Sequence, residues 1–430
     1  MEDIVSLCKR RGFIFQGSDI YGGLSGTWDY GPFGVTLKRN IMQLWWKMFV
    51  EEREDMFGID AAILMNQKVW QASGHVDTFT DPLIECNNCN GRFRADKVDV
   101  SRCPNCGQKG TFGEARQFNM MLKTHVGPVE DETSISYLRP ETAQGIFTNF
   151  KNVVDTLYPD LPFGLAQQGK AFRNEISPRD FIFRSREFEQ MEIEYFVHSK
   201  DWEAEFEKWV TAIHAWCDAL GLPSESVHEL EVAEHDRAHY SHRTIDFEFD
   251  FPIGREELLG LAYRTDFDLQ NIQRVSGKTM EYRPKDGSAP FVPHVIEPSF
   301  GLERALMAVL SAAYTEDEIN GEQRTYLRFP LALAPVRVAV SPLLKNKPEL
   351  VAKAREVYGL LKKEYGNVMW DDNGNIGKRY RRQDEIGTPY CIVIDFETIE
   401  GDTINTITVR NRDTTEQTRV PINELITFIS

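Results

Sequence analysis

Opposed charges and aromatic rings are concentrated between residues 171 and 195, in the stretch AFRNEISPRDFIFRSREFEQMEIEY. Period-two alternation predicts two strands here, joined by a long loop. Arg173 and Glu175 share a face of the first strand, and the second strand presents four side chains on one face: Phe188, Gln190, Glu192 and Glu194. Paired as a hairpin, the strands would form a surface suited to a nucleotide and an amine. A solvent-facing sheet with a charged ladder is the alternative for this segment alone.

A second arginine stands where a helix would begin. In EPSFGLERALMAVLSAAY, the apolar spacing from Leu302 to Ala313 predicts a buried helix that follows a strand at 291–296. Arg304 falls in the first turn of this helix, where a cation opposes the macrodipole. This position indicates that the arginine is held there to bind an anion. A further helix is predicted after Tyr137, with Pro140 at its first position and Glu141 in its first turn.

Four cysteines form two Cys-x2-Cys pairs, Cys86 with Cys89 and Cys103 with Cys106, separated by thirteen residues. This spacing is typical of a tetrahedral structural zinc site, and four sulfur ligands leave no open position for catalysis. The residues after the second cysteine of each pair, Asn90-Gly91 and Gly107, tolerate positive φ. Buried free thiols are the alternative. The other three cysteines, Cys8, Cys217 and Cys391, are expected in the core.

Composition limits the partners of the chain. Its 430 residues carry a formal net charge of −17, so only a local basic patch could bind nucleic acid. The best candidate is Lys378, Arg379, Arg381 and Arg382, although a solvated helix face explains the run equally well. The N-terminal residues contain no apolar signal core, and no apolar run is long enough to cross a bilayer. With an odd number of cysteines, these features favour a reducing cytoplasm.

Other patterns outline the elements around these residues. Helical spacing runs from Pro32 to about Met56, a strand is expected at 59–65, a helix at 201–220 and a strand at 244–251. The proline-punctuated segment 327–335 reads as a connection between domains. Beyond it, predicted strands at 336–340, 368–370, 390–394 and 404–409 alternate with helices, which indicates a small α/β domain.

Together and in this order, the motifs resemble those of the class II aminoacyl-tRNA synthetases, and among them the homodimeric glycyl-tRNA synthetases. FRNE with REFEQMEIEYF is similar to motif 2, EPSFGLERAL to motif 3, and residues 32–65 to motif 1. YLRPETAQGIF, YRTDFDL, NIGKRYRRQDEIGTP and TVRNRDTTEQ are similar to glycyl enzymes in particular. The resemblance covers essentially the whole chain. It implies an α+β fold: a catalytic domain over 1–330 built on an antiparallel sheet, with a zinc-ribbon insertion at 86–106, and an α/β anticodon-binding domain over 335–430.

By the same resemblance, ATP would lie between two catalytic arginines, with Arg173 at the α-phosphate and Arg304 at the γ-phosphate. Phe188 would stack on the adenine, and magnesium would be held by carboxylates such as Glu257 or Glu297. The implied ATP-binding residues are Arg173, Asn174, Glu175, Phe183, Arg184, Ser185, Arg186, Glu187, Phe188, Glu257, Leu258, Gly301, Leu302, Glu303 and Arg304.

The resemblance also implies a glycine pocket, in which several carboxylates suit the ammonium group. Its residues would be Arg94, Glu141, Phe188, Glu189, Gln190, Met191, Glu192, Arg264, Glu297, Ser299 and Gly301. Because glycine is the smallest amino acid, a filled pocket can refuse every larger one by overlap, so no editing domain is expected.

The implied function is ATP-dependent attachment of glycine to its tRNA through glycyl-adenylate, by a cytoplasmic homodimer without membrane contact. Lys378, Arg379, Arg381 and Arg382 would then contact tRNA. Three alternatives were weighed: an inactive paralogue that binds nucleic acid or a partner subunit, a synthetase for threonine, proline or histidine, and a zinc-ribbon regulator. The presence of Arg173, Glu175 and Arg304 argues against an inactive chain, and the glycyl-type segments argue against another amino acid.

Overall fold

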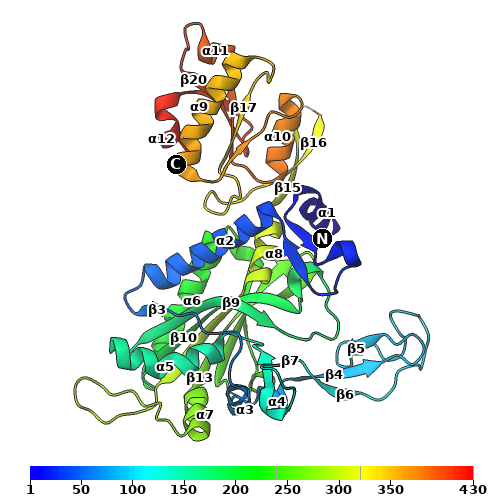
Figure 1. Ribbon diagram of the computed structural model, residues 1–430, viewed down its shortest axis with the longest axis vertical. Helices are drawn as coiled ribbons and strands as arrows, with labels where there is room; N and C mark the ends of the chain where they lie inside the picture. Colours follow the sequence, from blue (N-terminus) through cyan, green and yellow to red (C-terminus); the bar gives the residue numbers. More distant parts are fainter. Residues whose placement is uncertain (239, 320, 430) are drawn as a thin grey trace.

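A seven-stranded sheet lies at the centre of the larger, N-terminal part of the molecule (Figure 1). The computed structural model describes residues 1–238, 240–319 and 321–429. The strand order is β11-β12-β13-β14-β10-β9-β3, and all neighbours are antiparallel except β3 and β9. The strands are β3 (Met56–Gly58), β9 (Phe163–Phe172), β10 (Glu187–Val197), β11 (Val227–Glu231), β12 (Arg243–Phe251), β13 (Gly254–Thr265) and β14 (His294–Gly301).

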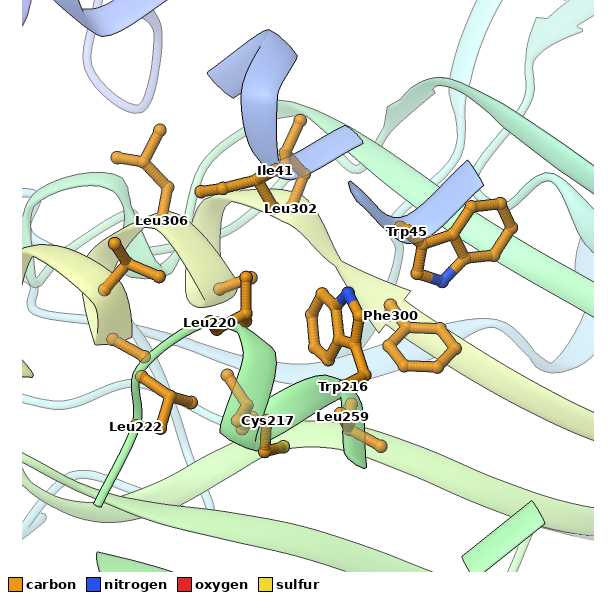
Figure 2. Close-up of a cluster of buried hydrophobic side chains, with 14 of the residues drawn as sticks. Ile41, Trp45, Trp216, Cys217, Leu220, Leu222, Leu259, Phe300, Leu302 and Leu306 are labelled. Carbon is orange, nitrogen blue, oxygen red and sulfur yellow. The ribbon is translucent and has the colours of Figure 1, made fainter. Parts of the chain in front are cut away.

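One face of this sheet is apolar and lies under three helices, α2 (Pro32–Trp46), α6 (Trp202–Ala219) and α8 (Leu302–Ala313). Figure 2 shows part of this core, where Trp45 of α2 and Trp216 of α6 approach Phe300 of β14. Both indole rings meet the Phe300 ring edge-on, with centroids 5.8 and 4.9 Å away. Each large side chain buried in this way contributes about 1.5–3 kcal/mol, so the packing fixes which face of each strand points inward.

The opposite face of the sheet is covered only in part. Four helices lie on this side: α3 (Gln67–Ala72), α4 (His75–Thr78), α5 (Ala143–Leu157) and α7 (Phe267–Ser276). Phe147 and Phe150 of α5 pack on Phe163 and Phe196 of the sheet in a second apolar cluster. Because α5 covers only the end of β10 that carries Phe196, the polar residues earlier on that strand form the floor of an open site.

Two smaller units are attached to this body. The chain begins with α1 (Glu2–Arg11) and the hairpin of β1 (Ile14–Gln16) and β2 (Trp28–Tyr30). Between α4 and β9 comes an insertion of β4 (Thr80–Glu85), β5 (Arg92–Arg94) and β6 (Arg116–Asn119), in the order β5-β4-β6. The hairpin of β7 (Leu122–His125) and β8 (Ile135–Leu138) then leads back to the sheet, and the insertion projects from the body (Figure 1).

The C-terminal part has its own five-stranded sheet, in the order β18-β17-β19-β20-β21, and its own apolar core. A hairpin of β15 (Tyr314–Ile319) and β16 (Glu322–Leu327) joins it to the body. Its strands are β17 (Val338–Pro342), β18 (Val368–Trp370), β19 (Tyr390–Ile394), β20 (Thr406–Asn411) and β21 (Gln417–Pro421); its helices are α9 (Pro348–Tyr365), α10 (Ile376–Glu385), α11 (Phe396–Ile399) and α12 (Leu425–Ile429). Among the described residues, no helix combines the length and apolar character needed to cross a membrane.

Several expected boundaries were wrong. The helix that begins at Pro32 ends in a π-helical turn at Lys47–Glu51, and the strand expected at 59–65 does not form. There the carbonyl of Ala61 accepts a hydrogen bond from Arg139 Nη1, at 2.8 Å, instead of pairing in the sheet. The strand expected at 291–296 runs from His294 to Gly301.

The first strand of the motif 2 hairpin lies earlier than expected. β9 ends at Phe172, so Arg173 and Glu175 belong to the loop that follows it. The backbone N–H of Asn174 donates to the Met120 carbonyl at 2.7 Å, which draws the chain away from β10. The alternation of β10 was predicted correctly: Met191, Ile193, Tyr195 and Val197 enter the core, and Phe188, Gln190 and Glu192 face the open site.

Candidate active site and metal centre

Two arginines flank a cavity of about 240 Å³ on the open face of the sheet. Arg173 donates from Nε to the Pro140 carbonyl at 3.0 Å, and its guanidinium lies 5.4 and 5.3 Å from the ring centroids of Phe79 and Phe188. Arg304, in the first turn of α8 as predicted, pairs with Glu257 at 2.9 Å. Both guanidiniums are therefore held in place and remain partly exposed, as the binding of a polyanion requires.

Most of the implied ATP-binding residues line this first cavity. They are Arg173, Glu175, Phe183, Arg184, Ser185, Phe188, Glu257, Leu258, Gly301, Glu303 and Arg304. Four others are not among its lining residues. Leu302 is in the core, and Glu187 pairs with Lys170 at 2.8 Å. Arg186 donates hydrogen bonds to the carbonyls of Ser25 and Glu175, and the backbone N–H of Asn174 donates to the Met120 carbonyl.

Glu303 has a structural role in this arrangement. Its carboxylate accepts hydrogen bonds from the Tyr30 hydroxyl at 3.0 Å and from the backbone N–H of Glu189 at 2.9 Å. Burial raises the pKa of Glu303 to about 7, and the charge of Glu189 adds to this effect. Glu303, which precedes the proposed γ-phosphate ligand Arg304, therefore connects α8 to β2 and β10.

A second cavity, of about 280 Å³, adjoins the first and shares four lining residues with it: Arg173, Gln190, Glu257 and Ser299. Six carboxylates line it, and three of them, those of Glu141, Glu192 and Glu297, belong to the implied glycine set. Each of these side chains is held by its own partner. A cationic cavity and an acidic cavity therefore meet on one face of the sheet.

Glu192 is fully hydrogen-bonded. One oxygen accepts from the backbone N–H and hydroxyl of Thr142, at 3.1 and 2.5 Å, and the other accepts from Ser299 Oγ at 2.8 Å and Gln190 Nε2 at 3.2 Å. Burial raises the pKa of Glu192, and the neighbouring Glu141 raises it further.

Glu297 is held from behind by Arg264, which is 1% exposed. Arg264 Nη1 donates to Glu297 at 2.6 Å, and its Nε donates to Asp268 at 2.8 Å. Burial raises the pKa of Glu297 to about 8, because Glu192 reinforces the effect of burial and Arg264 offsets only part of it. Arg264 thus supports the pocket wall without lining the cavity.

Glu141 lies just before α5 rather than in its first turn, because the helix begins at Ala143. Its Oε2 lies 3.2 Å from Nε2 of His75, and its Oε1 is buried without a hydrogen-bond partner among the described residues. Burial would raise the pKa of Glu141, but a positive charge on His75 and its hydrogen bond, with Arg264 and Arg173 nearby, lower it to about 2. Glu141 therefore presents an ionised oxygen that none of the described residues satisfies.

Five residues of the implied glycine set lie elsewhere. Glu189 and Met191 point to the other face of β10, where Glu189 pairs with Lys38 at 2.6 Å and Met191 enters the core. The run 188–192 cannot act as a unit, because alternate side chains of a strand face opposite ways. Phe188 and Gly301 line the first cavity, as does Arg94, which pairs with Asp81 and Asp96 at 2.9 and 2.8 Å.

Sequence reasoning missed Asp246, which lines the second cavity, and His75, which lies behind it. His75 gave no signal, because a lone histidine at the start of a short helix belongs to no motif. Asp246 did give one, since it alternates with Ile245 and Phe247 on a strand that had been predicted. Burial raises the pKa of Asp246 to about 6, with a contribution from Glu257.

The four cysteines of the insertion converge, with all four sulfurs within 4.8 Å of one another. Cys86 and Cys106 Sγ are 3.8 Å apart, and Cys89 and Cys103 Sγ are 3.7 Å apart. A tetrahedral site with metal–sulfur bonds of 2.3 Å has edges of about 3.8 Å, so these side chains are placed as metal ligands. Asn90 and Gly107 adopt φ of 56° and 70°, as predicted for the two turns.

The arginines of α10 interact with other groups of this chain. Arg379 is 3% exposed and donates to the carbonyls of Pro342 and Gly374. Arg382 pairs with Asp371 at 2.7 Å, and Arg381 with Glu322 at 2.7 Å. Among the residues that the structure describes, Lys378 is exposed and makes no ion pair. Arg379 is thus a structural residue, contrary to its predicted place on a phosphate-binding surface.

The comparisons with known proteins agree with this arrangement. Residues 128–313 match the model of the tRNA synthetase class II core domain (G, H, P, S and T), and residues 337–430 match that of the anticodon binding domain. A solved structure of Giardia lamblia prolyl-tRNA synthetase in complex with prolyl-adenylate has the same fold, with a TM-score of 0.71 at 16% identity, over 98% of this chain and 74% of that one. Fold and cavities together define a class II aminoacyl-tRNA synthetase.

Curated relatives narrow the family. The chain is 46% identical to the glycine–tRNA ligase of Cutibacterium acnes, over 100% of this chain and 95% of that protein. It is 48% identical to the glycine–tRNA ligase of Clostridium kluyveri, over 100% and 97% of the two chains. At this identity and coverage, the chain belongs to the glycine–tRNA ligase family.

Proposed function

We propose that this chain activates glycine with ATP and transfers the glycyl group to tRNA. The observation that carries the proposal is the junction of the two cavities, where Arg173, Gln190, Glu257 and Ser299 belong to both. A nucleotide in the cationic cavity and an amino acid in the acidic one would have their reacting groups at this junction. Such positioning supplies a large part of the rate enhancement in reactions of two bound substrates.

In the first step, a carboxylate oxygen of glycine would attack the α-phosphorus of ATP. A new bond to phosphorus forms, the bond to the bridging oxygen breaks, and pyrophosphate leaves with the electron pair. Arg173 would stabilise the charge at the α-phosphate and Arg304 that at the γ-phosphate, with the adenine on the Phe188 ring. The terminal ribose hydroxyl of tRNA would then attack the glycyl carbonyl and release AMP. No protein nucleophile takes part.

Glycine would bind with its ammonium in the acidic cavity. Glu141 offers the free ionised oxygen, while Glu192 and Glu297 add carboxyl oxygens to the wall of the cavity. Ser299 and Gln190, fixed by their hydrogen bonds to Glu192, would lie along the wall nearest the α-carbon. Because these groups are tied to one another, they cannot move aside for a larger side chain, and we expect alanine and serine to be excluded by overlap.

Two metals belong to the proposal. Zinc suits the four thiolates of Cys86, Cys89, Cys103 and Cys106, and would stabilise the fold of the insertion without a part in the chemistry. Magnesium suits the rim of the cavities, where Glu257 and Asp246 both line the second cavity and interact electrostatically; Glu257 and Glu297 each already pair with an arginine, Arg304 and Arg264. When bound there, magnesium would neutralise polyphosphate charge.

The remaining assignments concern partners and organisation. Residues 1–330 would form the catalytic domain and residues 335–430 the domain that binds the anticodon arm, with Lys378 as one phosphate contact. The functional unit would be a homodimer, and free thiolates for zinc would require a reducing compartment such as the cytoplasm.

The decisive experiment is pyrophosphate exchange with ATP and a panel of amino acids. We expect exchange with glycine alone, and comparable rates with alanine or serine would contradict the proposal. Glu192→Gln should raise the KM for glycine and leave that for ATP unchanged. Elemental analysis of chelator-washed protein should give one zinc per chain, whereas a folded protein without metal and with four titratable thiols would exclude the site.

A further inference from the structure

The carboxylate of Glu141 has two oxygens in different situations. Oε2 lies 3.2 Å from Nε2 of His75, and Oε1 is buried in the wall of the second cavity without a hydrogen-bond partner among the described residues. A buried carboxylate oxygen without a donor is costly unless a ligand satisfies it. Whatever holds Oε2 therefore decides where Oε1 points.

His75 is itself tightly placed. Its side chain is 11% exposed, and its ring meets Trp70 edge-on at 5.4 Å and lies 5.2 Å from Phe79. The backbone carbonyls of His75 and Val76 accept hydrogen bonds from Asn119 Nδ2 at 3.3 and 2.8 Å. The ring therefore has one available orientation, which sends Nε2 towards Glu141.

The two ring nitrogens have distinct roles. Nε2 faces a carboxylate, so it must carry a proton. Nδ1 lies 2.8 Å from Ser73 Oγ, which can donate to it or accept from it. Whether His75 is neutral or charged, Nε2–H donates to Glu141, and the hydroxyl of Ser73 accommodates either state.

The two other carboxylates of the implied glycine set in this cavity, Glu192 and Glu297, are held by groups of the sheet and by the N-cap residue of α5. Thr142 and Ser299 bind Glu192, and Arg264 binds Glu297. The partner of Glu141 comes from α4, which precedes the insertion. The same segment supplies Phe79, whose ring centroid lies 5.4 Å from the Arg173 guanidinium. Residues 73–79 thus contact a key side chain of both cavities.

We propose that His75 is a positioning residue for amino-acid binding, which holds Oε2 of Glu141 so that Oε1 is presented to the ammonium group of the substrate. This inference rests on the proposed function and extends it, because His75 acts through Glu141 and does not line the cavity. Phe79, from the same segment, contacts the guanidinium of Arg173 in the proposed nucleotide cavity and helps to position it.

Three substitutions at His75 test the geometry. Gln can place an amide donor near the position of Nε2, Asn can place one only near Nδ1, and Leu keeps the volume without a donor. In pyrophosphate exchange we expect His75→Leu and His75→Asn to raise the KM for glycine about ten- to a hundredfold, because each removes one charge-assisted hydrogen bond. His75→Gln should stay within a few-fold of the wild type. The KM for ATP should not change.

A double-mutant cycle separates positioning from general damage. In a Glu141→Gln background, His75→Leu should have little further effect on the KM for glycine, because its route of action is already lost. The matched control is His214→Leu on the surface of α6, where His214 pairs with Glu229 at 2.7 Å, and it should leave both KM values unchanged.

The outcomes are distinct. Wild-type protein without glycine-dependent exchange would overturn the proposed function itself. An active wild type with an unchanged glycine KM in His75→Leu would overturn the role of His75 alone. Parallel increases in the KM for glycine and ATP in all three variants, or full additivity with Glu141→Gln, would show that His75 only maintains the fold. If His75→Leu does not fold, the Gln and Asn pair still decides.

Discussion

The arginines that line the first cavity and those packed in and around the C-terminal part differ in what satisfies them. Arg173 and Arg304 each rest against an aromatic ring and keep part of the guanidinium open to a cavity. In the C-terminal part, Arg379 donates to backbone carbonyls, while Arg324 and Arg410 enclose Asp384, with all three side chains of this ion cluster buried. The cavity arginines can therefore bind a ligand, whereas those of the C-terminal part stabilise the fold. Charge in the sequence therefore indicates an anion site only where the guanidinium stays open to a cavity, as that of Arg304 does beside its partner Glu257.

Removing a cavity arginine should have the largest effect. Arg173→Ala and Arg304→Ala should each slow adenylate formation by about 10²- to 10³-fold, because each removes a preorganised charge from the polyphosphate. Rapid-quench measurement of the adenylate, with circular dichroism for the fold, tests this. Arg255→Ala is the matched control, since Arg255 pairs with Asp250 on the exposed end of the same sheet. A near-normal rate in either variant would place the nucleotide elsewhere.

Breaking the ion cluster of the C-terminal part should affect stability instead. Asp384→Ala leaves Arg410 buried without its carboxylate and Arg324 with Asp317 alone, and such a loss costs about 3–5 kcal/mol. Urea denaturation followed through the C-terminal domain measures it, and Asp372→Ala, at a less buried neighbouring carboxylate, is the control. A loss below about 1 kcal/mol would mean that solvent reaches the cluster.

Glu303 differs from Asp384 in the pH dependence that it should give to the free energy of unfolding. Asp384 lies between arginines, whereas Glu303 meets a phenol and an amide, and burial raises its pKa from 4.5 to about 7. The folded state thus binds this proton more tightly, so the free energy of unfolding should fall as the pH rises from 4.5 to about 7 and then level off. Glu303→Gln should remove about 3 kcal/mol of this decrease in the free energy of unfolding. Identical pH profiles for variant and wild type would refute the assignment.

The smallest effect is expected at Lys378, the exposed cation of the α10 run. Lys378→Glu should reduce the salt slope of tRNA binding by about 1 and spare pyrophosphate exchange. Reversing Arg381 and Arg382 is a less clean experiment, because their carboxylate partners Glu322 and Asp371 would then face new negative charges. An unchanged slope in Lys378→Glu would move the tRNA surface away from α10.

Local pattern predicted the parts of the site that local structure determines. The face of β10, the position of Arg304 and the convergence of the four cysteines depend on spacing within one element or one insertion, so the sequence sufficed. Arg173 was assigned to a strand because alternation continues beyond Phe172, and only the backbone bond from Asn174 to Met120 reveals where pairing stops.

Long-range partners account for what could not be predicted. The partner of Glu141 is a histidine from a segment before the insertion, and the partners of Arg379 are carbonyls of other loops. Neither group has a characteristic spacing, because residues far apart in the chain meet only after the sheets have formed. The implied glycine residues Glu189 and Met191 are a different case, since strict alternation already sends them to the core side of β10.

The contacts of α1 affect the order in which the molecule can fold. Arg10 and Arg11 pair with Glu385 at the end of α10, and Phe13 lies 6.3 Å from Phe329 in the same core that contains Ile386. α1 therefore lacks part of its docking surface until the segment around Glu385 has been synthesised. Because contacts so distant in sequence form later than local ones, we infer that α1 completes its docking late although it is made before its partners.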